Sequence, residues 1–378
     1  MRYITSLMLA LAACLASYAK TPQSLPREID TGFWRTGHIQ GIAVDSERKY
    51  IYYSFTTMLI KADLEGNVVG TVKGLLGHLG CITYNPEDGR VYGSLEYKKD
   101  AIGKGILKHS GTTQQLEDGF YIAIFDVDKI TRCDMSAEHD GVMTAVFLPT
   151  VLEDFKASVE NEGTTYAHRL GCSGIDGVSF GPKFGKTDGR KYLTVAYGVY
   201  RDLQRTDNDY QVLLQYDTRK WSTYEKPLLQ TSMHRNGPAK PNGTYFVYTG
   251  NTSYGVQNMA YDAEHKLWFM AVYKGRKEEF ANYTLFAADG AKKVTTQPLK
   301  GVDYIKRAKV VELADLGKRD PQHNEIRGWY FNAATGLCPL GNNLFYVSHN
   351  RKTKQGQTST IRLYRFTGEA EAPFKAIE

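Results

Sequence analysis

The sequence predicts an all-β protein that folds as a five-bladed β-propeller with long loop insertions on one face. One short motif recurs five times along the chain, and each copy leads through a turn into a second strand rich in aromatic residues. A third strand of alternating polarity follows in every copy. Three strands and a weaker fourth per repeat are the content of a propeller blade, so we predict this fold, with six or seven blades as the alternative.

The recurring motif consists of a small or polar residue, an apolar residue, a small residue and a second apolar residue, followed by a turn. Such alternation is typical of a short β-strand. The copies are Gly41–Asp45, Cys81–Asn85, Gly177–Gly181, Asn258–Asp262 and Gly336–Leu340. We expect them to form the inner strands, whose first residues line the mouth of a central channel.

The second and third strands follow each inner strand as hairpins. The expected second strands are Tyr50–Tyr53, Val91–Tyr92, Tyr192–Leu193, Leu267–Phe269 and Leu344–Tyr346. The expected third strands are Leu59–Asp63, Tyr121–Asp126, Val212–Asp217, Tyr283–Phe286 and Ile361–Arg365. Insertions are expected at residues 127–171, 230–252 and 299–332, between an outer strand and the next inner strand. Ile29–Trp34 is expected to supply the outer strand that closes the ring.

The amino-terminal residues have the features of an export signal. Arg2 precedes an apolar run from Ile4 to Ala16, and small residues follow up to Ala19, which predicts a signal peptide over residues 1–19. Residues 20–378 are then a single propeller domain, secreted or periplasmic. Because the residues before Cys14 also fit a bacterial lipobox, a lipoprotein attached through Cys14 is the alternative. No later stretch approaches the roughly 20 apolar residues of a membrane span.

The composition argues against several classes of function. The net charge is only +6 and no segment is rich in Lys and Arg, so nucleic-acid binding is not expected. The four cysteines after Cys14 have no CxxC pair and no close Cys/His spacing, so a structural zinc site is not expected, and their disulfide state stays open. The chain also lacks the GxSxG, HExxH and P-loop motifs. We expect a monomer.

The first repeat resembles the secreted bacterial propellers related to NHL-repeat and gluconolactonase-like proteins. The resemblance is carried by Gln40–Asp45 and by Ala62–Gly66. It covers one blade well and the other blades loosely. What it implies is the fold, because propellers of one architecture have many unrelated functions. No catalytic residue follows from it.

The strand ends on one face are the predicted functional site, because loops on a rigid scaffold concentrate binding and catalysis. In four blades a cation stands beside an aromatic residue or His after the second strand. Cations that meet in one cleft favour an anionic ligand. The candidate ligand-binding residues here are Lys98, Arg201, Tyr273, Lys274, Arg276, Asn350 and Arg351. The alternative is that these cations only keep exposed strand ends soluble.

Residues just before the inner strands should line the channel mouth. Gln40, Asp176 and Gln257 precede their motifs directly, and His38 and His78 lie slightly further out. Imidazole titrates near neutral pH, so His38, His78 and His349 are candidate acids or bases, although each can equally be a structural hydrogen-bonding residue.

Glu96 and Asp176 are the best carboxylate pair for glycoside hydrolysis, which needs two acids beside the scissile bond. Their blades are adjacent. Either carboxylate can instead pair with Lys98 or Arg201. No cofactor is expected, although Glu96, Asp176 and backbone carbonyls could hold a structural calcium ion.

These residues suggest an exported propeller that binds an acidic carbohydrate or another anionic small molecule. A uronate lyase would use Arg201, Arg276 and Arg351 to neutralise the carboxylate, with His78, His349 or Tyr197 as the base. A glycoside hydrolase that uses Glu96 and Asp176 is the enzymatic rival. The alternative is a non-catalytic ligand-binding or protein-interaction module of the cell envelope, so the sequence leaves enzymatic activity undecided.

Overall fold

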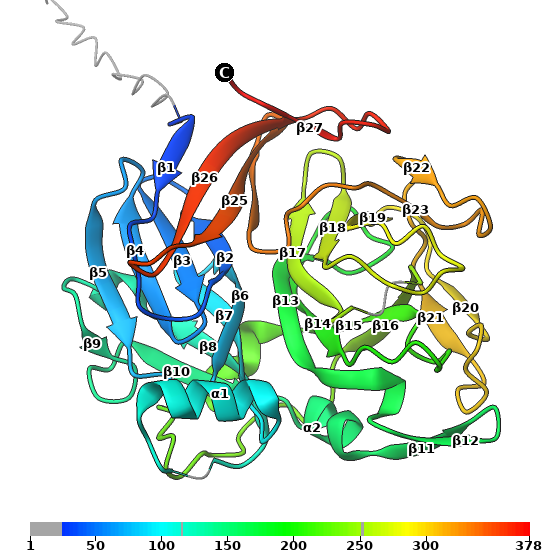
Figure 1. The fold of residues 1–378 in the computed structure, drawn as a ribbon, viewed down its shortest axis with the longest axis horizontal. Coiled ribbons are helices and arrows are strands. Elements are labelled where there is room, and N and C mark those ends of the chain that lie inside the picture. Colours follow the sequence, from blue (N-terminus) through cyan, green and yellow to red (C-terminus); the bar gives the residue numbers. More distant parts are fainter. Residues whose placement is uncertain (1–24, 115, 251–252) are drawn as a thin grey trace, which may run out of the picture.

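The protein is a five-bladed β-propeller (Figure 1), as the repeats predict. The computed structural model describes residues 25–114, 116–250 and 253–378; the expected signal peptide and Cys14 lie outside this range. Each inner strand lies beside the inner strands of the two neighbouring blades, in the order β2, β6, β13, β17, β24 and back to β2. Their bounds are Ile39–Val44, His78–Asn85, Cys172–Pro182, Val256–Asp262 and Leu337–Gly341. Each of the five motifs lies within or overlaps one of these strands.

The first three blades each have at least four strands. Blade one continues from β2 through β3 (Tyr50–Phe55), β4 (Met58–Asp63) and β5 (Val68–Lys73), to which β9 (Met135–Ser136) adds in parallel. Blade two continues from β6 through β7 (Arg90–Tyr97), β8 (Gly119–Phe125) and β10 (Met143–Phe147). Blade three continues from β13 through β14 (Lys191–Val199), β15 (Tyr210–Tyr216), β16 (Gly243–Tyr248), β21 (Ala308–Val310) and β20 (Thr295–Gln297).

The last two blades depart from this pattern. Blade four contains β17, β18 (Leu267–Val272) and β19 (Leu285–Asp289). On the outer side of β19, isolated bridges join Leu285 to Trp329 and Ala288 to Leu313. Blade five contains β24, β25 (Leu344–Lys352), β26 (Gln357–Phe366), β27 (Phe374–Ala376) and the amino-terminal strand β1 (Glu28–Asp30).

The ring closes through the amino-terminal segment. Strand β1 pairs antiparallel with β26, with Ile29 opposite Ile361, and Trp34 forms a further bridge to Gln357. The expectation that Ile29–Trp34 supplies the closing strand is therefore confirmed. Because this pairing joins the two ends of the described chain, blade five cannot form completely without both of them.

The insertions carry the remaining elements. Helix α1 (Ala101–Ser110) joins β7 to β8, and α2 (Pro149–Lys156) lies between β10 and β13. Two hairpins, β11 (Ser158–Asn161) with β12 (Thr164–Ala167) and β22 (Lys318–Arg319) with β23 (Arg327–Gly328), complete the strands. Short 3₁₀ helices cover Val127–Lys129, Arg169–Gly171 and Thr218–Thr223. No helix in the described ranges is long and apolar enough to cross a membrane.

The small residues of the repeated motif have a steric cause. A Cβ atom on Gly41 would lie 2.8 Å from the backbone nitrogen of Ile82 in the next inner strand, which is closer than carbon and nitrogen can approach without a shift. The inner strands pack tightly around the channel axis, and glycine permits this approach. The small residues of the motif are therefore required by the close packing of the inner strands at the propeller centre.

Aromatic side chains fill the space between neighbouring blades. Tyr92 of blade two meets Phe180 of blade three edge to face, with ring centroids 5.0 Å apart. Phe269 of blade four meets Phe345 of blade five in the same way at 5.6 Å. Such contacts bury large apolar surfaces in preferred geometries. The high Tyr and Phe content is thus partly accounted for by packing between blades.

Polar side chains fix the starts of the inner strands relative to one another. The Ser54 hydroxyl donates to the carbonyl of Gly80 at 2.7 Å, and the Ser94 hydroxyl donates to the carbonyl of Asp176 at 2.6 Å. The Asn258 amide donates to the carbonyls of Gln40 and Ala334, each at 2.7 Å. These bonds cross blade boundaries, so they hold this end of the channel as a rigid frame for the residues above it.

The four cysteines of the described chain are free thiols, with Cys81 and Cys172 buried and Cys133 exposed. The buried cysteines belong to inner strands, where a small apolar side chain fits the crowded centre. Burial raises the pKa of Cys81 to about 11, so this thiol stays protonated and unreactive at neutral pH.

Candidate functional site

A cavity of about 300 Å³ opens at the mouth of the channel where the inner strands begin. Residues from blades one to four and from helix α1 line it: His38, Gln40, Thr56, His78, Glu96, Lys98, Ile102, Ser173, Ile175, Asp176, Gly198, Tyr254, Gln257 and Tyr273. We call it the central cavity. The other end of the channel is a smaller hollow of about 150 Å³ lined mainly by apolar residues such as Ile42, Ile82 and Met259. Chemistry-bearing side chains are therefore concentrated at one end.

Many of the residues singled out in the sequence meet in the central cavity. They come from the starts of inner strands and the ends of second strands, which emerge on the same face as expected. These residues are His38, Gln40, His78, Glu96, Lys98, Asp176, Gln257 and Tyr273. These eight residues bring together two carboxyl groups, two imidazoles, one ammonium group, two amides and a phenol.

Glu96 lies at the end of β7 in a buried ion pair. Its Oε1 is 2.5 Å from Lys98 Nζ, and its Oε2 accepts from the backbone nitrogen of Ile175 at 3.1 Å. Lys98 also donates to the carbonyl of Ser173 at 2.9 Å. Burial raises the pKa of Glu96, while Lys98 and the Ile175 amide oppose that rise. The Lys98 contact favours the ionised carboxylate.

Asp176 has a different environment although it faces the same cavity. Its Oδ2 accepts from Gln257 Nε2 at 3.0 Å, and no cation pairs with it in the described chain. Burial, followed by the negative charge of Glu96, raises the pKa of Asp176 well above its usual range. Both effects favour the protonated form of the Asp176 carboxyl. The ion pair with Lys98 thus distinguishes Glu96 from Asp176, whose side chain contacts an uncharged amide.

The two histidines of the cavity are neutral. Burial lowers the pKa of His38, whose Nε2 lies 3.1 Å from the hydroxyl of Tyr273. Burial, followed by the neighbouring charge of Lys98, lowers the pKa of His78 to about 3. The Nδ1 atom of His78 is buried without a hydrogen-bond partner and lies 3.9 Å from Glu96 Oε1. Neither imidazole carries charge at neutral pH.

Tyr254 is a cavity residue that sequence reasoning missed. Its side chain is 43% exposed, which is unusual for a large aromatic residue beside buried acids. Its backbone has φ of +66°, a left-handed conformation that costs energy for a bulky residue. Its ring meets Tyr273 edge to face at 6.0 Å, and its carbonyl accepts from Gln257 Nε2 at 3.0 Å. The amide that contacts Asp176 therefore also holds Tyr254.

A positional signal could have identified Ser173 and Tyr254, which the sequence reasoning missed. His38, His78, Ser173 and Tyr254 all stand three or four residues before a copy of the repeated motif, and all of them line the cavity. Ile102 is different, because it comes from helix α1. The side chain of its amino-terminal cap, Asp100, accepts from the backbone nitrogens of Ile102 and Gly103, both at 3.0 Å.

The other candidate residues do not line the central cavity. Tyr197 is buried and its hydroxyl donates to Asp154 Oδ2 at 2.6 Å, while His349 Nε2 lies 3.0 Å from the hydroxyl of Tyr364. The remaining candidates have exposed side chains: Arg201, Lys274, Arg276, Asn350 and Arg351. Among the described residues, these candidate cations therefore form no convergent cluster at the channel mouth.

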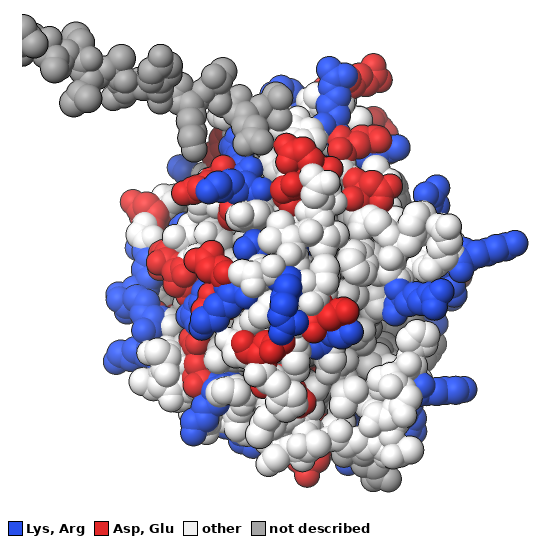
Figure 2. Space-filling model, turned by 90° about the vertical axis from the view of Figure 1, so that its left-hand side faces the viewer, with Lys and Arg blue, Asp and Glu red and all other residues white. Residues whose placement is uncertain are grey.

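The surface charge is also mixed elsewhere. On the side of the molecule that carries blade one, Lys and Arg side chains are interspersed with Asp and Glu (Figure 2).

In the described chain, one group of three metal-ligating side chains has its ligand atoms within 4.8 Å of one another, namely Asp262, Glu264 and His265. It belongs to the turn between β17 and β18 and contributes nothing to the cavity lining.

The low pKa of His78 predicts an acid-dependent loss of stability. Above about pH 6.5 the imidazole is neutral in both the folded and unfolded states. As the pH falls from there toward 3, the unfolded chain binds a proton that the folded site rejects. We expect this to lower the unfolding free energy by about 1.4 kcal/mol per pH unit. The difference between wild type and His78→Gln in urea unfolding at pH 7 and pH 4 measures this contribution.

The matched control is His109→Gln, because His109 is an exposed residue of helix α1. Its replacement should leave the pH dependence of unfolding unchanged. Equal slopes for wild type and His78→Gln between pH 7 and pH 4 would contradict a buried neutral imidazole.

Comparison with models of known protein families gives no match for this chain, and comparison with curated protein sequences gives none either.

Proposed function

We propose that the central cavity binds a saccharide and hydrolyses a glycosidic bond. The observation that carries this proposal is the pair of carboxyl groups facing one cavity in different environments. Glu96 is paired with Lys98 at 2.5 Å, whereas Asp176 is hydrogen-bonded to an uncharged amide. Glycoside hydrolysis needs one protonated and one ionised carboxyl beside the scissile bond.

Asp176 takes the role of general acid. Its raised pKa favours the protonated carboxyl, and Gln257 can hold the carboxyl in place before and after the proton leaves. The proton passes from Asp176 to the glycosidic oxygen while the bond from that oxygen to the anomeric carbon breaks.

Glu96 takes the role of the ionised partner. Lys98 and the amide of Ile175 stabilise its negative charge. The carboxylate either accepts a proton from the attacking water or adds to the anomeric carbon itself, and the stereochemistry of the first product distinguishes these two routes. Both routes consume one water and regenerate the acid.

The aromatic residues of the cavity support a saccharide as substrate. Tyr254 is exposed at the cavity, and Tyr273 braces it edge to face. A tyrosine ring offers an apolar surface to the C–H face of a sugar while its hydroxyl stays hydrated. Strained backbone at a binding site is retained when the strain positions a functional side chain. We assign Tyr254 the role of a stacking platform.

The hydrolase is favoured over a uronate lyase. A lyase needs cations to neutralise the uronate carboxylate, and Arg201, Arg276 and Arg351 are exposed residues that do not line the cavity. Lys98 lines it but is already paired with Glu96. His78 is neutral, yet an imidazole with a pKa of about 3 is a weak base.

Export to the periplasm or the medium is part of the proposal. It rests on the signal-like sequence of residues 1–19. We also propose a relationship to the NHL-repeat and gluconolactonase-like propellers, supported by Gln40–Asp45, which covers most of β2, and Ala62–Gly66, the turn after β4. A polysaccharide outside the cell is a substrate that such a protein can reach.

The test is an assay of the purified protein with a panel of neutral and uronate-containing polysaccharides. A hydrolase releases new reducing ends without ultraviolet absorbance, whereas a lyase creates an unsaturated uronate that absorbs. We expect reducing ends alone. Absorbance that rises together with the number of reducing ends would show that the enzyme is a lyase and not a hydrolase. Saccharide binding without cleavage would indicate that the protein is a non-catalytic binding module.

A further inference from the structure

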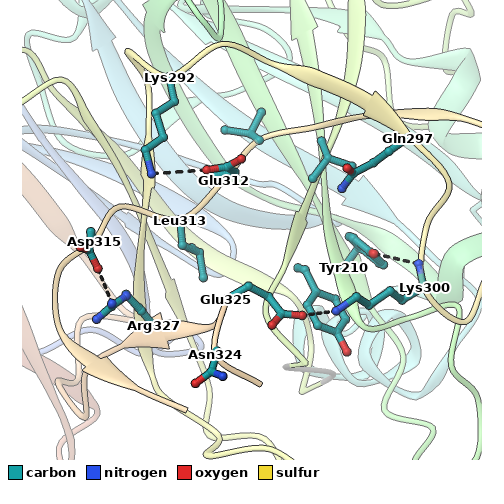
Figure 3. A pocket seen from close by; sticks show the side chains of 13 residues that line it. Tyr210, Lys292, Gln297, Lys300, Glu312, Leu313, Asp315, Asn324, Glu325 and Arg327 are labelled. Carbon is teal, nitrogen blue, oxygen red and sulfur yellow. Dashed lines mark hydrogen bonds and ion pairs between the residues drawn. The ribbon is translucent and has the colours of Figure 1, made fainter. Parts of the chain in front are cut away.

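A second cavity, of about 440 Å³, lies away from the channel, between the outer strands of blade three and the segment that leads to β23. Figure 3 shows it from close by. It shares no lining residue with the central cavity. Its volume falls in the range of sites that hold small organic ligands or a few sugar rings. We call it the outer cavity.

The charges that surround the outer cavity neutralise one another. Lys292 Nζ lies 3.4 Å from Glu312 Oε2, and Lys300 is paired with Glu325 as Arg327 is with Asp315. Figure 3 shows these three pairs spaced around the cavity. Each cation already has a carboxylate partner, so the cavity offers no surplus charge to an anion or a cation.

The interior of the cavity is apolar and aromatic. Val310 and Leu313 line it together with Tyr210 and Tyr248, whose ring centroids are 5.0 Å apart. The Tyr210 hydroxyl accepts from the backbone nitrogen of Lys300 at 2.9 Å. The two rings therefore have fixed positions in the cavity wall, where Tyr210 is only 3% exposed and Lys300 Nζ lies over the Tyr248 ring, 5.0 Å from its centroid. They form a rigid apolar wall beside the polar groups of the cavity.

Three polar groups at the cavity have no hydrogen-bond partner among the described residues. They are the side-chain amides of Gln297 and Asn324 and the hydroxyl of Tyr248, and the two amides belong to exposed residues. A side-chain amide presents donors and an acceptor side by side, which matches two adjacent hydroxyl groups. The two amides and the hydroxyl are thus uncharged hydrogen-bonding groups of the kind that bind the hydroxyl groups of a neutral polyol.

We propose that the outer cavity is a second saccharide-binding site, which holds a neutral segment of a glycan away from the central cavity. Paired charges disfavour ionic ligands, the aromatic and aliphatic side chains form a rigid apolar wall, and the free amides and hydroxyl bind sugar hydroxyls. The site needs no catalytic step, so it goes beyond the proposed hydrolysis and does not depend on Asp176 or Glu96.

Native electrophoresis through gels that contain xylan, galactomannan, arabinan or β-glucan tests the site. The parent protein carries Asp176→Asn, so that cleavage does not remove the ligand, and Tyr254→Ala, so that stacking in the central cavity is weakened. We expect at least one neutral polysaccharide to retard this protein. The loss of two hydrogen bonds in Gln297→Ala/Asn324→Ala should weaken binding about tenfold.

Tyr248→Phe removes only a hydroxyl and should weaken binding less while the ring packing is retained. The matched control is Gln355→Ala, which removes an exposed amide from the β25–β26 hairpin and should not change mobility. No retardation by any of the neutral polysaccharides, or equal retardation of the double variant and its parent, would overturn the second site. If retardation requires Gln297 and Asn324 but the wild-type protein cleaves no polysaccharide, the second binding site is supported and the proposed hydrolase is rejected.

Discussion

Replacing Asp176 by Asn is expected to reduce the hydrolysis of a natural polysaccharide by about 10²–10⁴-fold, the usual contribution of a general acid. The substitution keeps the shape of the side chain and an oxygen that can accept from Gln257. It also introduces no charge, and the raised pKa favours a neutral carboxyl in the native protein. We therefore expect the melting temperature to change little, and initial rates of reducing-end release measure the loss of activity.

A set of substrates with different leaving groups separates acid catalysis from binding. A glycoside whose leaving group has a low pKa needs little protonation, so Asp176→Asn should cleave it at nearly the wild-type rate. Asp188→Asn, a change in an exposed turn, is the matched control and should be fully active on every substrate. Asp176→Asn with undiminished activity on the polysaccharide would rule out Asp176 as the acid.

The fold was predictable because its strongest constraint is local. The crowding that demands Gly41 beside Ile82 leaves a short motif in each blade, and the motif marks every inner strand. The closing strand was also predictable, since a closed ring needs one more outer strand and Ile29–Trp34 precedes the first repeat. The bridges from Leu285 to Trp329 and from Ala288 to Leu313 in blade four were not predictable, because the partners come from a long insertion without a periodic pattern.

The candidate site was predictable only where the strand register is rigid. His38, His78 and Asp176 line the cavity because they lie directly before, at the start of, or in the first half of inner strands that are tied across blades. His349 and Arg351 do not line it, because β25 continues to Lys352 and pairs with β26 along its whole length. Arg201 follows the end of β14, where the chain enters a loop whose direction no local pattern encodes.

Replacing Lys98 by Met is expected to have a large effect on stability. We expect it to lower the unfolding free energy by about 3–5 kcal/mol at pH 7. Lys98 and Glu96 side chains are both 5% exposed, so the substitution leaves a buried carboxylate without its cation. Carboxylates Glu96 and Asp100 raise the pKa of Lys98 against the opposing effect of burial, which keeps the ammonium charged. Urea unfolding followed by tryptophan fluorescence measures the change.

The pH dependence of this loss identifies its cause. Without Lys98, burial raises the pKa of Glu96 in the folded state further above its unfolded value of about 4.3. Below that pH the Glu96 carboxyl is protonated in both the folded and the unfolded state, so no charge is buried on folding. The variant should therefore lose less stability at pH 4 than at pH 7. Lys98→Met/Glu96→Gln should recover part of the loss, because it removes the orphaned charge. Lys129→Met breaks a pair whose lysine is 61% exposed and should cost under about 1 kcal/mol. A Lys98→Met protein as stable as Lys129→Met at pH 7 would mean that the Glu96 carboxylate is hydrated rather than buried.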